Sequence, residues 1–261
     1  MSAGPAATPG PAALAVADLR VTYGGVHAVD GATFEVPEGR LTGLIGPNGA
    51  GKSTVLAVIA GGRRPSGGRV VLNGQDIAGW PAHRVARRGV IRTFQLSSEF
   101  AHLTVLENLI VAAPEQRGAG FGGALLGKRY WRAQQAQIVA RADRLLDEFQ
   151  LGPSRNLYAG ELSGGQKRLV EIMRGLMAGP SLLLLDEPLA GVNPSLRLVV
   201  ESHLIRLRDQ GLTMIMVEHE LPTVERCCDS VVVMARGRVL AEGSMAQLRK
   251  DQEVIDAYLV G

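Results

Sequence analysis

Cysteine is nearly absent from this chain: the 261 residues include two, the adjacent pair Cys227 and Cys228. Neighbouring cysteines make a poor structural staple, so the sequence excludes a small secreted fold held by disulfides and indicates a reducing compartment. We expect both thiols to be small, buried apolar side chains without a redox or metal role.

Long hydrophobic runs are absent as well. No stretch of about 18 apolar residues occurs, so we do not expect the chain itself to span a bilayer. The first 13 residues carry no charged side chain and no basic start followed by an apolar stretch, so they do not form a secretion signal. We predict a disordered tail over residues 1–13 and one folded domain over residues 14–261.

Aromatic residues and excess charge are both scarce. Aromatic side chains make up 4% of the chain and hydrophobic ones 46%, so the expected core consists of Leu, Val, Ile and Ala. The formal net charge is +3, and the basic clusters lack interleaved aromatic residues, which argues against nucleic acid as a partner. We interpret the clusters as solvated helix faces, with an edge near a membrane as the alternative; they comprise Arg63, Arg64, His83, Arg84, Arg87, Arg88 and Arg92.

A phosphate-binding loop is the first motif that is present. The segment Gly46-Pro47-Asn48-Gly49-Ala50-Gly51-Lys52-Ser53 fits G-x-x-x-x-G-K-[ST] and follows the apolar run Leu41 to Ile45. Its glycines let backbone N–H groups face inward, and a helix beginning near Lys52 adds the positive end of its dipole. A polyphosphate fits this loop, with Lys52 against the β- and γ-phosphates and the Ser53 hydroxyl on magnesium.

Two adjacent acids end a second apolar strand. Asp186 and Glu187 follow the run Ser181 to Leu185, whose four leucines indicate a strand buried on both faces of a parallel sheet. Ligands of open α/β sheets bind beyond the carboxyl ends of the strands, so we expect these acids beside the phosphate loop. Two carboxylates beside a polyanion require a divalent cation. Asp186 is therefore predicted to hold magnesium, and Glu187 to polarise the attacking water.

Another glycine-containing helix start lies between these motifs. In Leu162-Ser163-Gly164-Gly165-Gln166, Ser163 and Gln166 form a capping box, which by itself explains a plain helix start. Gly164 and Gly165 each disfavour a helix by about 1 kcal/mol relative to alanine, but they permit close approach of an anion to the helix dipole. One chain cannot easily bring both helix starts to the same γ-phosphate, so we expect a second copy to face the first.

With these motifs, the chain resembles the ATP-binding subunit of ABC transporters over nearly all of its length after the first dozen residues. The resemblance implies that Tyr23 stacks on adenine, that Gln95 contacts magnesium and water, and that His219 contacts the γ-phosphate. The simpler interpretations are an exposed strand tyrosine for Tyr23 and a structural histidine for His219. The set implied for ATP comprises Tyr23, Gly46, Asn48, Gly49, Ala50, Gly51, Lys52, Ser53, Thr54, Ser163, Gly164, Gly165 and Gln166.

The resemblance also assigns chemistry to side chains. The predicted catalytic residues are Lys52, Gln95, Glu187 and His219, and the predicted magnesium ligands are Ser53, Gln95 and Asp186. Two nucleotide-binding subunits, identical or paralogous, would close head to tail on two ATP molecules. The Ser163 helix of each would then meet the γ-phosphate held by Lys52 of the other.

The fold class implied is α/β: a P-loop NTPase core of mainly parallel sheet, with an antiparallel β-subdomain and an inserted helical lobe. Two antiparallel strands are expected between Ala13 and Val36. The α/β core is expected to resume with a strand at Arg69 to Leu72, a helix near residues 81–88 and a strand at Val90 to Phe94. Strands and helices should then alternate from Ser181 to Met234, before a hairpin around Arg236-Gly237 and a helical end from Leu248 to Val260.

The helical lobe is predicted over about residues 95–159, followed by the signature helix over residues 163–179. A helix is expected from Leu103 to Val111, and a longer one from Tyr130 to Leu151. The glycine-rich span 114–128 between them reads as a mobile loop. Permease subunits are expected to dock near Gln95, on an apolar groove that includes Phe94, Leu96, Phe100 and Leu103. They would hold the chain at the cytoplasmic face of the membrane.

Four segments narrow the resemblance to the branched-chain (hydrophobic) amino acid uptake group: Arg92 to Gln95, Leu103 to Leu109, Ala190 to Pro194, and Val254 to Leu259. Urea importers have very similar ATPases, so the transported solute stays open. Asn193 stands where many members have aspartate, which puts a cross-site salt bridge in doubt. Followed by Pro194, Asn193 also fits a helix N-cap.

Two other functions stay open at this point. A soluble ABC ATPase acting as a scaffold or assembly factor would keep every nucleotide residue, and copurification with a polytopic membrane protein would distinguish a transporter from it. A small-molecule kinase or GTPase explains the phosphate loop, but it leaves Ser163 to Gln166, Gln95 and His219 without roles.

Overall fold

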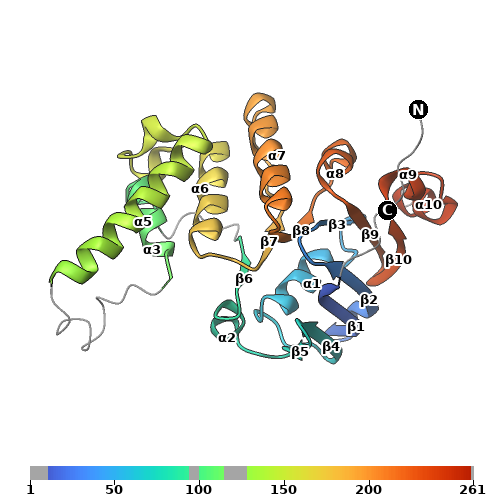
Figure 1. The fold of residues 1–261 in the computed structure, drawn as a ribbon. Coiled ribbons are helices and arrows are strands. Elements are labelled where there is room, and N and C mark those ends of the chain that lie inside the picture. The colour runs from blue at the N-terminus through green and yellow to red at the C-terminus, as the bar shows by residue number, and fades with distance from the viewer. Residues whose placement is uncertain (1–10, 94–99, 115–127, 260–261) are drawn as a thin grey trace.

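Two sheets lie side by side in the fold, with a group of helices to one side of them (Figure 1). The computed structural model describes residues 11–93, 100–114 and 128–259. Within these ranges, no helix combines the length and apolar character that crossing a bilayer would need.

The N-terminal sheet is antiparallel, with four strands in the order β2-β1-β4-β5. Its hairpin confirms the two antiparallel strands predicted between Ala13 and Val36, although β1 begins at Ala12, inside the predicted tail. The remainder of that tail, residues 1–10, lies outside the described residues. The strands are β1 (Ala12–Tyr23), β2 (Val26–Pro37), β4 (Gly67–Leu72) and β5 (Gln75–Asp76).

The prediction that the strand at Arg69 to Leu72 resumes the α/β core is wrong. This strand, β4, instead pairs antiparallel with β1, and Leu72 lies opposite Leu14. Val70 and Leu72 are buried, whereas Arg69 is exposed and Val71 only half-buried. Such one-sided burial suits an antiparallel sheet with one solvated face, because strands of a covered parallel sheet are buried on both.

The second sheet has six strands in the order β10-β9-β3-β8-β7-β6 and is parallel up to the antiparallel β9–β10 hairpin, which was predicted around Arg236-Gly237. Every residue of β3, β7 and β8 is buried, as predicted for strands covered on both faces. The strands are β3 (Leu41–Ile45), β6 (Val90–Arg92), β7 (Leu182–Asp186), β8 (Thr213–Val217), β9 (Ser230–Ala235) and β10 (Arg238–Gly243).

The helices of this core confirm the strand and helix alternation predicted from Ser181 to Met234. The helical end predicted from Leu248 corresponds to α10, which begins later, at Gln252, where the Asp251 carboxylate accepts a hydrogen bond from the Glu253 N–H at 2.9 Å. The helices are α1 (Lys52–Ile59), α2 (Ala82–Ala86), α7 (Pro194–Asp209), α8 (Leu221–Cys227), α9 (Met245–Leu248) and α10 (Gln252–Leu259).

The remaining helices lie to one side of the parallel sheet (Figure 1). Their shared core confirms the apolar face predicted for the long helix, with Ala142, Leu146 and Phe149 buried and Ile138 and Leu145 packed against them. The predicted loop at 114–128 lies mostly outside the described residues. The elements are α3 (Val105–Ala112), α5 (Lys128–Glu148), the 3-10 turns η2 (Gly152–Ser154) and η3 (Ala159–Glu161), and α6 (Gly164–Met177).

Both cysteines lie at the end of α8, as free thiols. Cys227 is fully buried, and burial raises its pKa to about 12. Burial also raises the pKa of the half-buried Cys228. Both therefore stay protonated near neutral pH, which agrees with the expectation that they are small apolar side chains.

Candidate active site

The phosphate loop connects β3 to α1 along a path that other backbone segments restrict. Gly46 has φ 145°, and a Cβ there would lie 2.0 Å from the Met234 carbonyl oxygen. Gly51 has φ 98°, and its Cβ would lie 2.5 Å from the Ala28 carbonyl oxygen. Glycine is therefore required at both positions by the packing of β2 and β9, independently of any ligand.

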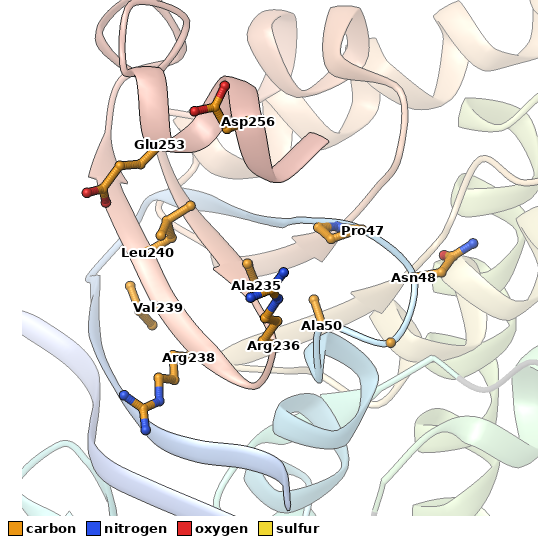
Figure 2. A pocket seen from close by; sticks show the side chains of 11 residues that line it. Pro47, Asn48, Ala50, Ala235, Arg236, Arg238, Val239, Leu240, Glu253 and Asp256 are labelled. Atoms are coloured by element: carbon orange, nitrogen blue, oxygen red, sulfur yellow. The ribbon is translucent and has the colours of Figure 1, made fainter. Parts of the chain in front are cut away.

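A cavity of about 610 Å³ lies on one side of this loop (Figure 2). Its walls are the loop residues 47–50, the β9–β10 hairpin and α10, and neither Lys52 nor Asp186 lines it. The C-terminal part of the chain thus packs around the phosphate loop without contributing to the polar network described next.

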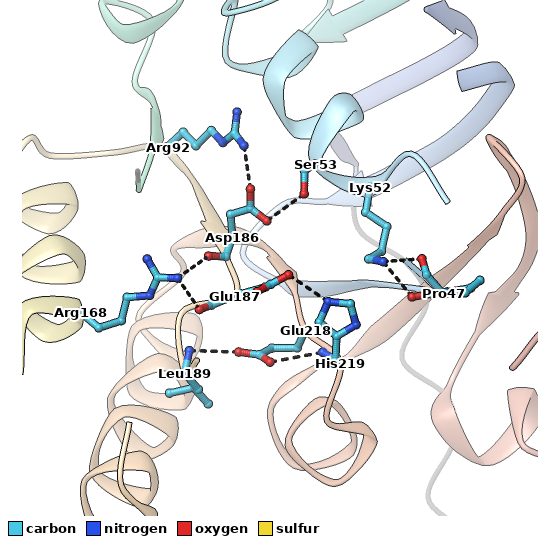
Figure 3. A network of polar contacts seen from close by, with 11 residues as sticks. Pro47, Lys52, Ser53, Arg92, Arg168, Asp186, Glu187, Leu189, Glu218 and His219 are labelled. Atoms are coloured by element: carbon cyan, nitrogen blue, oxygen red, sulfur yellow. Dashed lines mark hydrogen bonds and ion pairs between the residues drawn. The ribbon is translucent and has the colours of Figure 1, made fainter. Parts of the chain in front are cut away.

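The carboxyl ends of β3, β8 and β7 lie next to one another, because β8 pairs in parallel with both of its neighbours. Val217 lies opposite Leu44 on one side and Asp186 on the other. The predicted phosphate loop, the two acids and His219 follow these strand ends, and Figure 3 shows their side chains converging. The parallel sheet therefore brings together three motifs that are far apart in sequence.

Lys52 is buried, with 6% of its surface exposed, at the start of α1. Its ammonium group donates hydrogen bonds to the carbonyl oxygens of Gly46 at 2.8 Å and Pro47 at 2.9 Å. Burial lowers the pKa of Lys52, while the charges of Glu187 and Asp186 act in the opposite direction. The lysine is thus held by neutral acceptors within reach of a phosphate that enters the loop.

Asp186 is engaged through both carboxylate oxygens. Oδ1 accepts a hydrogen bond from the Ser53 hydroxyl at 3.3 Å, and Oδ2 pairs with Arg92 Nη2 at 2.6 Å. Ser53 and Asp186, both predicted magnesium ligands, are therefore adjacent. A hydroxyl and a carboxylate are the oxygen donors that magnesium prefers, so this pair fits the ion.

Glu187 has the backbone of a left-handed residue, with φ 50°. Its N–H donates to the Val217 carbonyl at 3.0 Å, and its own carbonyl accepts a hydrogen bond from Arg168 Nη2 at 2.9 Å. Its Oε1 lies 2.9 Å from His219 Nε2, so the second acid and the predicted histidine form one pair. Left-handed backbone at a residue with a Cβ costs about 1–2 kcal/mol, and these three contacts hold it in place.

Glu218 supports the Glu187–His219 pair through hydrogen bonds to the neighbouring backbone. Its buried carboxylate accepts hydrogen bonds from the Leu189 N–H at 3.0 Å and the His219 N–H at 3.3 Å. Burial raises the pKa of Glu218, although both backbone hydrogen bonds oppose the rise. Glu218 thereby connects the segment after β7 to the segment after β8.

Tyr23 ends β1 on the antiparallel sheet and is 44% exposed. The Arg63 guanidinium lies over its ring, 4.0 Å from the centroid. One ring face is thus covered by a cation, a contact that the interpretation of Arg63 as a solvated side chain missed.

The Ser163 segment begins α6 with the predicted capping box. The Gln166 N–H donates to Ser163 Oγ at 3.3 Å, and Gln166 Oε1 accepts from the Ser163 N–H at 3.0 Å. Ser163 and Gly164 are exposed. Among the described residues, no hydrogen bond joins this segment to the phosphate loop, so the polar network above does not include it.

Asn193 caps α7, as its sequence predicts. Its Oδ1 accepts a hydrogen bond from the Leu196 N–H at 2.9 Å, and Pro194 occupies the first turn. The side-chain oxygen of Asn193 is engaged in capping α7, so the residue has a structural role within its own chain.

Gln95 and the groove residues Phe94 and Leu96 lie outside the described residues. Of the rest of the predicted groove, Leu103 is half-buried, and the ring of Phe100 lies under the guanidinium of Arg174, 4.3 Å from its centroid. The docking surface therefore stays a prediction.

The interpretation of Arg92 as part of a solvated helix face is wrong. Arg92 lies in β6, its side chain is 17% exposed, and it pairs with Asp186. Its position within the predicted strand Val90 to Phe94 was the available signal against a helix face, and the observed strand ends at Arg92, at the same sheet edge as Asp186. Arg168, which holds the Glu187 carbonyl and pairs with Glu171 at 2.8 Å, was also missed.

Comparisons with known proteins agree with this geometry. Residues 29–190 match the family model described as ABC transporter, and residues 238–259 match the one described as branched-chain amino acid ATP-binding cassette transporter. The high-affinity branched-chain amino acid transport ATP-binding protein BraF of Pseudomonas aeruginosa is 38% identical over 247 residues, which cover 94% of this chain and 97% of that protein. LivG of Escherichia coli, of the same printed description, is 36% identical with the same coverage.

A solved structure is also similar to this chain. The ADP conformation of an ATP-binding cassette of an ABC transporter matches with a TM-score of 0.82 and 33% identity, and covers 96% of this chain and 100% of that one. The α/β fold with its phosphate loop is therefore that of an ABC ATPase. On the family match, the relatives and the site together, the chain belongs to the ABC transporter family as an ATP-binding subunit, and it is an ATPase.

Proposed function

We propose that this chain hydrolyses ATP to power the uptake of branched-chain amino acids through partner permeases. One observation carries the proposal: Lys52, the Ser53–Asp186 pair and the Glu187–His219 pair gather at one edge of the parallel sheet. The names of the relatives and the family matched by residues 238–259 support the choice of solute.

The phosphate loop would bind the triphosphate through its backbone N–H groups, from Gly46 to Thr54, and Tyr23 would stack on adenine. Lys52 would leave the carbonyl oxygens of Gly46 and Pro47 for the β- and γ-phosphate oxygens. Charged phosphate oxygens would then replace neutral carbonyl oxygens as acceptors, which adds the attraction between opposite charges to each hydrogen bond.

Ser53 and Asp186 would hold magnesium, with Gln95 as a further ligand by resemblance to the family. When bound, the ion would neutralise charge on the β- and γ-phosphate oxygens. The proximity of Ser53 Oγ and Asp186 Oδ1, 3.3 Å apart, supports this assignment.

Glu187 would accept a hydrogen bond from the attacking water. This would orient the water in line with the bond between the γ-phosphorus and the leaving ADP. His219 holds the carboxylate through the 2.9 Å contact in this structure, and when ATP is present it would donate its N–H to a γ-phosphate oxygen instead. The hydrogen bond from Arg168 would keep the backbone of Glu187 in the orientation that aims its side chain.

Two such subunits, identical or paralogous, would close on two ATP molecules, with Ser163, Gly164, Gly165 and Gln166 of one facing the phosphate loop of the other. The exposed, self-capped start of α6 supports this arrangement. The domain would begin with β1 at Ala12, and its helical lobe would bind permeases that keep it at the cytoplasmic face of the membrane.

Reconstitution tests the proposal. The chain is purified with the permeases encoded beside it and placed in liposomes with the matching binding protein. We expect ATP-dependent accumulation of radiolabelled leucine, and none with Glu187→Gln. Accumulation of urea instead would contradict only the solute, whereas a chain found solely in a soluble complex would favour the scaffold function.

A further inference from the structure

We infer that Arg92 is the resident counter-cation of Asp186 and competes with magnesium for this carboxylate. The inference rests on the proposed magnesium site. It assigns to Arg92 the role of setting how tightly the nucleotide-loaded protein holds the ion.

The contact is short and shielded. Arg92 Nη2 lies 2.6 Å from Asp186 Oδ2, and the two side chains are 17% and 9% exposed. Little water competes for either partner, so the pair is screened far less than a surface ion pair. With Ser53 on the other oxygen, every acceptor atom of the carboxylate already has a partner.

The backbone fixes Arg92 at this place. β6 pairs in parallel with β7, Arg92 lies opposite Leu184, and the Thr93 N–H donates to the Leu184 carbonyl at 3.0 Å. Asp186 is two residues further along β7, at the same sheet edge. The guanidinium therefore reaches the carboxylate from a neighbouring, rigid strand.

Other cations at the site have other partners. Lys52 binds the carbonyl oxygens of the phosphate loop, and Arg168 binds Glu171 and the main-chain carbonyls of Asp186 and Glu187. In the part of the chain that is described, Arg92 alone forms an ion pair with the Asp186 carboxylate. Without Arg92 the buried carboxylate would lose the one direct ion pair it has among the described residues, which is a costly state.

Magnesium and Arg92 would share the negative charge of one carboxylate. The ion would bind beside Ser53 at Oδ1 while Arg92 holds Oδ2, and two cations at one carboxylate repel each other. Arg92 Nε is buried and has no hydrogen-bond partner among the described residues, so its present position is not fully satisfied. We therefore expect Arg92 to withdraw from Asp186 when the ion binds, and its removal to tighten ion binding.

Isothermal titration with ADP, which is not turned over, measures this competition. The dissociation constant is determined with saturating magnesium and with EDTA for the parental chain, Arg92→Gln, Arg92→Lys and the control Arg87→Gln, which removes an exposed charge from the end of α2. We expect Arg92→Gln to bind magnesium–ADP about tenfold more tightly, and Arg92→Lys and Arg87→Gln to resemble the parental chain. Equal or weaker binding by Arg92→Gln would overturn the inference.

Ser53→Ala separates this inference from the proposed function. If magnesium fails to strengthen ADP binding by the parental chain, or if Ser53→Ala keeps the full magnesium effect, the proposed ion site is wrong and the inference falls with it. If that effect is present and Ser53→Ala loses it, an unchanged Arg92→Gln refutes the role of Arg92 alone.

A measurement on the unmodified sequence covers the case in which Arg92→Gln does not fold. The Nε–H resonance of Arg92, assigned from its loss in Arg92→Lys, is followed by NMR. We expect it to shift with magnesium–ADP but not with metal-free ADP. A resonance that is indifferent to magnesium would mean that the ion pair persists and that no competition takes place.

Discussion

This protein has two glycine-containing helix starts, at Lys52 and at Ser163. They differ in whether a side chain caps the first backbone N–H groups of the helix. Helix α1 begins after Gly51 without any side-chain cap, so its first N–H groups keep their hydrogen-bonding capacity for a ligand. Helix α6 begins with a complete capping box between Ser163 and Gln166. The first start requires a ligand for completion, whereas the second is complete as a helix and still carries two glycines that helix formation disfavours.

The difference indicates whether each helix start acts within its own chain or toward another molecule. The Lys52 start lies in a network that includes Asp186, Glu187 and His219, all from its own chain. Ser163 and Gly164 are exposed, and in the described part of the chain the hydrogen bonds of Ser163 and Gln166 stay within their own capping box. We propose that the exposed Gly164 accommodates another molecular surface, whereas Gly165 is buried against Val192 of its own chain. The predictions below test this contrast in order of decreasing effect.

Glu187→Gln should have the largest effect. Glutamine keeps the size of the side chain but cannot take up a proton from water, so we expect the ATPase rate to fall by about 10²–10⁴-fold while ATP still binds. Uncleaved ATP should then hold two subunits together, visible as an ATP- and magnesium-dependent dimer in size-exclusion chromatography. Glu220→Gln, a change of an exposed acid two residues before Pro222, serves as the control and should keep turnover. Parental turnover by Glu187→Gln would exclude its assigned role.

Lys52→Ala comes next. It removes two charge-assisted hydrogen bonds to phosphate, so we expect the affinity for ATP to fall about a hundredfold in a titration of the monomer. Lys167→Ala changes a lysine of the first turn of α6 and should leave this affinity unchanged. Equal losses in the two variants would erase the contrast between the helix starts, and retained micromolar affinity in Lys52→Ala would contradict the phosphate-loop assignment.

Gly164→Ala tests the second helix start most directly. A Cβ at Gly164 meets nothing within 4 Å in the isolated chain, and its φ is not positive. We expect unchanged or slightly higher thermal stability, yet about tenfold weaker ATP-dependent dimerisation of the Glu187→Gln protein, because the added methyl group lies where the other surface approaches. Gly67→Ala, at another position with room for a Cβ, is the control. Unimpaired dimerisation would show that Gly164 does not face a partner.

The smallest expected effect is that of Glu218→Gln on how the free energy of unfolding changes with pH. The folded pKa of Glu218 lies above the ordinary value of 4.5, so the protonated form favours folding and its contribution is lost as pH rises through the raised pKa. Glu218→Gln should therefore flatten the fall in unfolding free energy above pH 4.5, as measured by urea denaturation at several pH values. A curve that keeps the parental slope would mean that other groups cause it.

Sequence reasoning reached the strands and motifs because buried apolar runs and glycine loops are local signals. It predicted the strand β4 but assigned it to the wrong sheet, because the periodicity of a short strand does not encode its neighbour, and the pairing with β1 arises from tertiary contacts. It placed Asp186 and His219 at one edge because parallel strands share that edge. It misassigned Arg92, because the direction of a long side chain depends on the carboxylate that it meets on the neighbouring strand.

The left-handed backbone of Glu187 has a consequence for protein engineering. Glycine pays no steric penalty in that conformation, so it would relieve about 1–2 kcal/mol of strain while abolishing the acid. A search for heat-resistant variants by melting temperature alone would accordingly enrich inactive proteins at this position. Selection for durability has to be coupled to a readout of turnover, because here robustness and activity favour different amino acids.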